Sequence, residues 1–255
     1  MNPPHAIEKV VSQLRTLRLP YMRRAAPELL KTARSQRWDP AEALSALLEE
    51  EIEGRARSSR AQRLKSANLP SGKTFATWDE DLSSIPLPTQ RALRTLEWIE
   101  RRENVVACGP AGTGKSHFLE ALAHRAIERG YKASWFSLEE LGRLIRGSRA
   151  DNSALRAVQK ILKVDLIVID DIGLLPIDQE TAEGFFRVID AAYERRSIAL
   201  SSNLHPSRFD EIMPKSLANA AVDRLLHHTH PCQTSGDSIR LTQALAGEGV
   251  MPLEQ

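Results

Sequence analysis

The chain has 255 residues, 42% of them hydrophobic and 27% charged, and a formal net charge of +2. This fits one α/β domain with a sizeable core plus a small extra domain. No apolar run approaches the roughly 18 residues of a membrane span, and residues 1–5 lack the apolar core of a secretory signal. Cys108 and Cys232 lie far apart in apolar runs, so we expect buried thiols. These features exclude a membrane or disulfide-stabilised protein and favour a cytoplasmic one.

The charge is distributed unevenly along the chain. Residues 1–75 carry 14 Lys/Arg against 8 Asp/Glu, whereas the remainder carries more acidic than basic residues. A basic segment joined to an acidic body suggests an anionic partner for the first part. A solvated helical surface would explain the same composition.

Apolar residues at helical spacing predict three short N-terminal helices. The first ends at Pro20, and Pro27 interrupts or restarts the second. Asp39, followed by Pro40 and Glu42, is a strong start for the third helix because it supplies an N-cap, a proline at the first position and a capping-box acid.

The end of the third helix is strongly basic. Its cationic residues are Arg55, Arg57, Arg60, Arg63 and Lys65. No aromatic residue lies among them, so phosphate contacts on duplex DNA fit better than stacking on single-stranded bases. We assign residues 1–68 to a helical domain that binds DNA, with a protein partner as the alternative.

Residues 69–88 contain several prolines and a glycine and are predicted to be a linker. An ATPase domain is expected over residues 89–245, and residues 246–255 are expected to form a tail. The expected strands are 104–108, 132–136, 166–169 and 198–202. The expected helices are 89–102, 117–129, two within 139–162, 178–195 and 215–228. Alternating strands and helices predict an α/β fold with a parallel sheet between two layers of helices.

The most informative motif is a match to G-x-x-x-x-G-K-[ST], the phosphate-binding P-loop. Its residues are Gly109, Pro110, Ala111, Gly112, Thr113, Gly114, Lys115 and Ser116. The glycines allow successive amides to point at a polyphosphate, Lys115 would reach the β- and γ-phosphates, and Ser116 would bind Mg²⁺. A strand precedes the loop and a helix follows it, as the motif requires. His117, at the start of that helix, is counted among the nucleotide-binding residues.

A second motif is an apolar run that ends in Asp170 and Asp171. A buried parallel strand has this character, and its carboxyl end lies at the ligand-binding edge of an open α/β sheet. Asp170 is placed to hold Mg²⁺, and Asp171 to orient the attacking water. Together the two motifs indicate a nucleoside triphosphate, Mg²⁺ and phosphoryl transfer to water.

Three further residues are candidates because of their positions. Asn203 ends the strand expected beside the acidic one and could hold the attacking water, although a turn cap would explain it too. Arg224 could be an arginine finger that enters a neighbouring subunit's site, or a surface residue paired with Asp223. Arg240 is a candidate second sensor of the γ-phosphate, or simply faces water.

His227, His228 and His230 cluster in sequence. Neither Cys232 nor another nearby residue completes a zinc spacing, and histidines at a helix end interact favourably with its dipole. We therefore predict no metal site there.

In order, GPAGTGKS, DLIVIDDIG, SSN and VDRLLHH resemble the AAA+ ATPases of the bacterial initiator clade, and in particular the IstB-like transposition helper proteins. The likeness extends to LRLPYMRRAAPELL near the N-terminus, RRENV, YERRSIALSSN and SIRL. It implies a P-loop AAA+ three-layer sandwich preceded by a small all-α domain. It also implies ATP binding at the interfaces of a homo-oligomer, assembly on duplex DNA of little sequence preference in the bacterial nucleoid, and stimulation of a DDE transposase.

The resemblance also implies that the two-helix insert at 139–162 lines the DNA path. Its candidate contacts are Arg143, Arg146, Arg149 and Lys160. Asp171 departs from the pattern, because many AAA+ proteins have Glu there, which keeps a non-hydrolysing nucleotide switch open as an alternative. Little chain follows Arg240, which leaves little room for the helical lid of full AAA+ modules.

Two other classes remain open. A replicative helicase loader shares the AAA+ body and would use its N-terminal domain to bind a hexameric helicase. A small-molecule P-loop kinase would need an acceptor pocket and an Arg-rich lid, and the sequence indicates neither.

Overall fold

The computed structural model describes residues 3–146 and 153–245, and the chain divides into two compact units, residues 1–62 and 63–255. The division falls within one helix, α3 (Pro40–Ala67). No helix in the described ranges is both long and apolar enough to cross a membrane. Cys108 and Cys232 are buried free thiols, as predicted.

The first unit contains α1 (Pro3–Thr16), α2 (Pro20–Ser35) and the first part of α3. The predicted start of α3 is confirmed, because Asp39 accepts a hydrogen bond from the Ala41 amide and its own amide donates to Glu42. The structure differs from two of the sequence expectations. Pro27 lies inside α2 without ending it, and α3 is a long helix of 28 residues.

Glu51 on α3 joins this helix to α2. Its carboxylate is buried and accepts hydrogen bonds from the Tyr21 and Met22 amides at the start of α2, each at 2.9 Å. Those amides have no partner within their own helix, so Glu51 caps α2 from another helix. Burial of Glu51 opposes ionisation, but the Met22 amide, Arg55 and the Tyr21 amide outweigh it and lower the carboxyl pKa.

We predict that Glu51→Gln destabilises the first unit by about 1–3 kcal/mol, the usual effect of disrupting a buried hydrogen-bonding group. Because the folded-state pKa is lowered, the contribution of Glu51 is present above the ordinary Glu pKa of about 4.3 and is lost as the pH falls through the folded-state value. Hydrogen exchange at the Tyr21 and Met22 amides measures this locally.

The matched control is Glu53→Gln, which removes an exposed carboxylate paired with Arg57. Exposed pairs contribute roughly 0–1 kcal/mol, so this variant should leave amide protection at Tyr21 unchanged. Equal protection in wild type and Glu51→Gln would contradict the capping role.

The second unit is built on a five-stranded parallel sheet with the order β2-β3-β4-β1-β5. The strands are β1 (Asn104–Cys108), β2 (Ala133–Ser137), β3 (Leu166–Ile172), β4 (Ser197–Ser202) and β5 (Thr229–Gln233). The first four match the predicted strands. The edge strand β5 was not predicted, because a proline and a histidine interrupt its apolar pattern.

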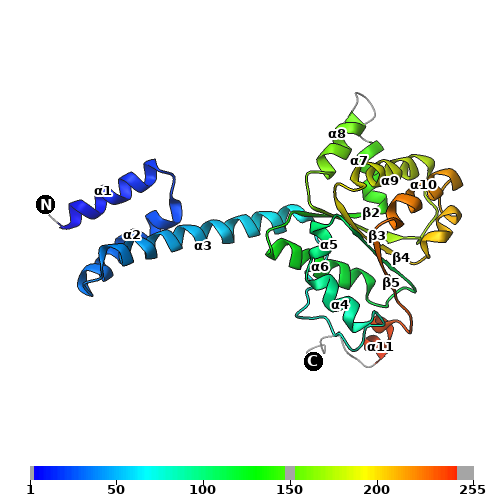
Figure 1. The fold of residues 1–255 in the computed structure, drawn as a ribbon, viewed down its shortest axis with the longest axis horizontal. Coiled ribbons are helices and arrows are strands. Elements are labelled where there is room, and N and C mark those ends of the chain that lie inside the picture. The colour runs from blue at the N-terminus through cyan, green and yellow to red at the C-terminus, as the bar shows by residue number, and fades with distance from the viewer. Residues whose placement is uncertain (1–2, 147–152, 246–255) are drawn as a thin grey trace, which may run out of the picture. The chain divides into compact units, whose positions relative to one another are not determined.

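Helices cover both faces of this sheet (Figure 1). On β3, Leu166 and Val168 pack with the helices of one face, whereas Ile167 and Ile169 pack with those of the other. The first face is covered by α4 (Leu87–Arg94), α5 (Glu97–Glu100) and α6 (Lys115–Glu128). The second is covered by α7 (Leu138–Arg146), α8 (Ser153–Ile161), α9 (Gln179–Ala192) and α10 (Lys215–Leu226).

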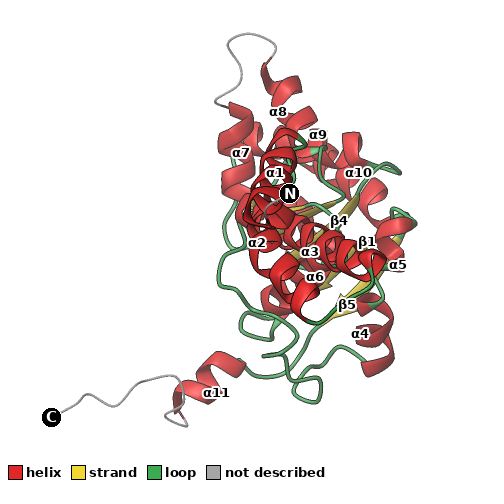
Figure 2. Cartoon of the chain, turned by 90° about the vertical axis from the view of Figure 1, so that its left-hand side faces the viewer, coloured by secondary structure: helices red, strands yellow, loops and turns green. Residues whose placement is uncertain are grey.

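Figure 2 shows the strands enclosed between these helical layers. Burial on both faces explains why the central strands β1 and β3 contain continuous apolar runs rather than alternating ones. The predicted three-layer α/β fold with an all-α N-terminal part is therefore confirmed.

Two local features differ from the sequence expectations. Residues 69–88 are part of the second unit, and Ser71 among them donates through its amide and its hydroxyl to the buried carboxylate of Glu120 on α6. The single helix expected at 89–102 is broken at Leu96, whose φ is 68°. This break lets Trp98 enter the core, where its indole Nε1 donates to the Leu93 carbonyl.

Candidate nucleotide-binding site

The P-loop lies at the carboxyl end of β1, between β4 and β5. In open α/β sheets ligands bind beyond the carboxyl ends of the strands. A cavity of about 790 Å³ lies there. The predicted residues that line it are Ala111, Gly112, Gly114, Lys115, Ser116, His117, Asp170, Asp171, Asn203 and Arg240.

Two P-loop glycines have conformations that exclude a side chain. Gly109 has a φ of 146°, and a Cβ there would lie 2.1 Å from the Thr234 carbonyl oxygen. Gly112 has a φ of 83°, and its Cβ would lie 2.1 Å from the Ser238 hydroxyl. The residues after β5 therefore press against the loop, a contact that the sequence motif does not indicate.

Lys115 folds back over the P-loop. Its Nζ donates to the carbonyls of Gly109 at 2.8 Å and Pro110 at 2.6 Å. Burial lowers the pKa of Lys115, while Asp170 and Asp171 oppose that shift. A buried ammonium held by neutral carbonyls is a suitable partner for an incoming polyphosphate.

Ser116 and Asp170 meet across the cavity floor. The Ser116 hydroxyl donates to Asp170 Oδ1 at 2.9 Å, and the Ser201 hydroxyl on β4 donates to the same oxygen. Hydroxyl and carboxylate oxygens are the ligands that Mg²⁺ prefers. The donor set present here therefore fits this ion.

Asp171 sits in a bulge of β3. The β3–β4 register shifts between Ile169 and Ile172, and Asp171 has a φ of 61°. A bulge redirects a side chain relative to its neighbours, and Asp171 is exposed where the rest of β3 is buried. Desolvation by the surrounding cavity and then repulsion from Asp170 raise the carboxyl pKa of Asp171, while Arg240 and Lys115 lower it.

Asn203 and Arg240 approach the cavity from opposite sides of the P-loop. Asn203 follows β4, and its amide donates to the Ile172 carbonyl at 2.9 Å, next to the bulge. Arg240 lies on α11 (Ile239–Leu245), whose first amide donates to the Gly112 carbonyl at 3.1 Å. A conformational change in the P-loop would therefore act directly on α11 through this hydrogen bond.

Arg224 does not line the cavity of its own chain. Its Nε lies 2.7 Å from Asp190 Oδ1 on α9, and its guanidinium lies 5.2 Å from the Phe186 ring centroid. The ion-pair partner is therefore Asp190 rather than the neighbouring Asp223.

Trp78 is a cavity residue that sequence analysis missed, because it lies in the segment predicted to be a linker. Its ring edge lies 3.2 Å from where a Cβ on Gly114 would be, and it packs edge-on against His117. The indole Nε1 donates to Gln90 at 2.7 Å, and Gln90 is fully buried. These contacts hold an aromatic surface at the cavity wall.

The predicted DNA-contacting residues differ in how far their charges are already engaged by other residues of the chain. Arg55 and Arg57 form ion pairs with Glu51 and Glu53. The Nε of Arg63 is buried without a hydrogen-bond partner in the described structure, and Arg60 also interacts with another residue. Of these four, Arg55, Arg57 and Arg60 are exposed, as are Lys65, Arg143 and Lys160. Arg149 and the side chain of Arg146 lie outside the described residues.

A P-loop after β1, paired acids on β3 and an asparagine after the adjacent β4 define an AAA+ fold. Solved structures support this class. AMPPCP-bound DnaA from Aquifex aeolicus aligns with a TM-score of 0.53 at 20% identity over 72% of this chain and 59% of that chain. The DnaC helicase loader aligns with a TM-score of 0.51 at 15% identity over 58% of this chain and 88% of that chain.

Sequence comparison then identifies the family. The model of the IstB-like ATP binding protein family matches residues 12–246. An insertion sequence IS21 ATP-binding protein from Pseudomonas aeruginosa is 33% identical over 94% of this chain and 90% of its own length. An IS5376 ATP-binding protein from Geobacillus stearothermophilus is 32% identical over 92% of this chain and 95% of its own length. The chain belongs to the IstB-like ATP binding protein family.

We predict that Gly112→Ala lowers affinity for a fluorescent ATP analogue at least about tenfold, equivalent to 1.4 kcal/mol. A Cβ there would displace Ser238 and strain the loop. The matched control is Gly236→Ala, which has a φ of 95° and nothing within 4 Å of its Cβ. It should change affinity less than about threefold, and equal losses in the two variants would contradict the role of the Ser238 contact.

Proposed function

We propose that this protein is an ATP-dependent transposition helper. In this proposal the ATP-bound chains assemble on duplex DNA and stimulate a DDE transposase, and ATP hydrolysis resets the assembly. The observation that carries the ATPase part is the convergence of Lys115, the Ser116–Asp170 pair and Asp171 on one cavity. Relatives named as insertion-sequence ATP-binding proteins, similar over nearly their whole length, support the transposition part.

Each cavity residue has a role that follows from its chemistry. The P-loop amides and Lys115 bind the β- and γ-phosphates. Ser116 and Asp170 would hold Mg²⁺, which when bound neutralises phosphate charge. Asp171 orients the attacking water, and Asn203 senses the γ-phosphate.

Arg224 and Arg240 supply positive charge from two directions. Arg240 belongs to the same cavity and would contact the γ-phosphate of its own chain. We assign Arg224 to the site of a neighbouring subunit, because it is partly exposed and lies outside its own cavity. Such a guanidinium stabilises charge that develops during phosphoryl transfer.

The DNA part of the proposal depends on phosphate contacts. Lys65, Arg143 and Lys160 are exposed cations on helices, suited to the DNA backbone. Phosphate contacts carry no base information, so sequence preference should be slight. Binding should also weaken steeply as the salt concentration rises.

The test is to measure ATPase rate and particle size with and without duplex DNA, in ATP and in ADP. We expect large DNA-bound particles and a stimulated rate only in ATP, and neither in Lys115→Ala. If these assemblies form, adding a transposase should increase strand transfer. Hydrolysis by Lys115→Ala would contradict the assigned site.

Other outcomes separate the alternatives. A DNA-indifferent chain that binds a hexameric helicase would indicate a loader, a class whose member DnaC shares this fold. A DNA-indifferent monomer that phosphorylates a small acceptor would indicate a kinase. ATP-dependent assembly without hydrolysis would indicate a nucleotide switch.

We predict that Arg224→Ala loses DNA-stimulated ATPase activity but retains nucleotide affinity. Mixing it with Lys115→Ala should restore part of the activity, because some interfaces then combine an intact Lys115 site with an intact Arg224. Arg187→Ala, which removes an exposed arginine of α9 paired with Glu183, is the control and should stay active. No recovery in the mixture would argue against action between subunits.

A further inference from the structure

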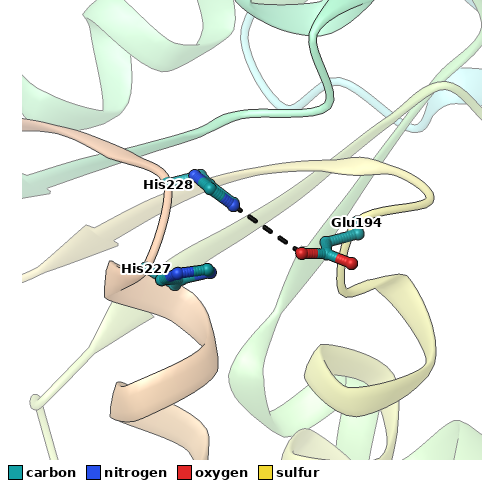
Figure 3. Close-up of side chains that lie close together, drawn as sticks. All are labelled: Glu194, His227 and His228. Atoms are coloured by element: carbon teal, nitrogen blue, oxygen red, sulfur yellow. Dashed lines mark ion pairs between the residues drawn. The ribbon is translucent and has the colours of Figure 1, made fainter.

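A second group of polar side chains lies apart from the nucleotide cavity. Glu194, His227 and His228 each offer a ligand atom within 4.8 Å of the other two, and all three residues are exposed. His228 Nε2 lies 3.7 Å from Glu194 Oε1 (Figure 3). Within residues 3–146 and 153–245, these three residues are the one group of at least three His, Cys, Asp or Glu side chains whose ligand atoms lie this close together.

The backbone brings the three residues together from two turns. Glu194 lies between α9 and β4 in a left-handed conformation, with a φ of 55°, and its carbonyl accepts a hydrogen bond from Arg102. His227 and His228 follow the last residue of α10 and lead into β5. The local sequence around the histidines does not reveal this group, because Glu194 precedes them by an entire strand and helix.

One histidine also has an orienting partner. The Tyr193 hydroxyl lies 2.7 Å from Nδ1 of His227. Histidines that bind metals commonly use one ring nitrogen for the metal and hold the other in such an outer hydrogen bond. The rings of His227 and His228 lie 4.0 Å apart between centroids, so both imidazoles face the same small region.

The donor set defines the ion. Two imidazoles and one carboxylate suit Zn²⁺ and similar transition metals, whereas Mg²⁺ and Ca²⁺ prefer oxygen ligands alone. Zinc binds such atoms at roughly 2.0–2.2 Å. Because the side chains are exposed, rotation about their own bonds can bring atoms within 4.8 Å of one another onto one ion.

We propose that Glu194, His227 and His228 form a binding site for Zn²⁺ or a chemically similar divalent transition metal, with Tyr193 orienting His227. Bound there, the ion ties the end of α9 to the end of α10. The Asp190–Arg224 pair joins the same two helices. The two histidines lie about one helical turn beyond Arg224. An ion bound to them would therefore help to hold Arg224 in position. This site does not depend on the proposed function.

The test is calorimetric titration of the full chain with Zn²⁺, after chelator treatment and without nucleotide. Excess Mg²⁺ in every sample competes for sites that are made of oxygen ligands alone. We expect wild type to bind one equivalent of Zn²⁺, and His228→Ala and Glu194→Ala to lose that equivalent. Tyr193→Phe should weaken binding by about tenfold, the lower end for an outer-shell partner. Titration with Co²⁺ adds a spectroscopic readout of ligand geometry.

The matched control is His5→Ala. His5 forms a similar exposed pair with Glu8, at 3.6 Å, but has one imidazole instead of two. This variant should bind Zn²⁺ as wild type does, and circular dichroism checks that all variants are folded. Wild type that binds no Zn²⁺, or His228→Ala that binds it equally well, would overturn the proposal.

Discussion

The parallel pairing of β3 with β4, and of β4 with β1, is the constraint on which the nucleotide site depends. It places the P-loop, the acids of β3 and Asn203 at one edge of the sheet. Ser201 fixes this junction, because its hydroxyl donates to Asp170 and accepts from the Asp171 amide. One small side chain thereby sets the relative position of the two carboxylates.

Features that depend on local chemistry could be predicted from the sequence. The P-loop and the acidic end of β3 are short motifs whose spacing is typical of a site for phosphate and metal. Strands buried on both faces were recognisable as apolar runs, and the Asp39 cap was recognisable from three residues. In each case the physical requirement and the residues that meet it lie within one short segment.

Features that depend on contacts distant in sequence could not be predicted in the same way. Gln90 on α4 fixes Trp78, which lies in a loop, and Glu120 anchors a segment that its prolines mark as a linker. Glu51 caps α2 through the Tyr21 amide, which lies 30 positions earlier in the sequence. Glu194 is near the histidines only because the turn between α9 and β4 lies next to the turn between α10 and β5. No local pattern encodes such meetings, since they arise from topology.

The indole at the cavity wall has a consequence for studying this protein. Of the four tryptophans in the chain, Trp78 lines the cavity, whereas Trp98 and Trp135 are buried in the core and Trp38 belongs to the first unit. Indole emission responds to the polarity and mobility of its surroundings. A ligand that binds beside Trp78 would change both. The intrinsic tryptophan fluorescence of the protein can therefore be used to measure occupancy of the cavity without an added dye.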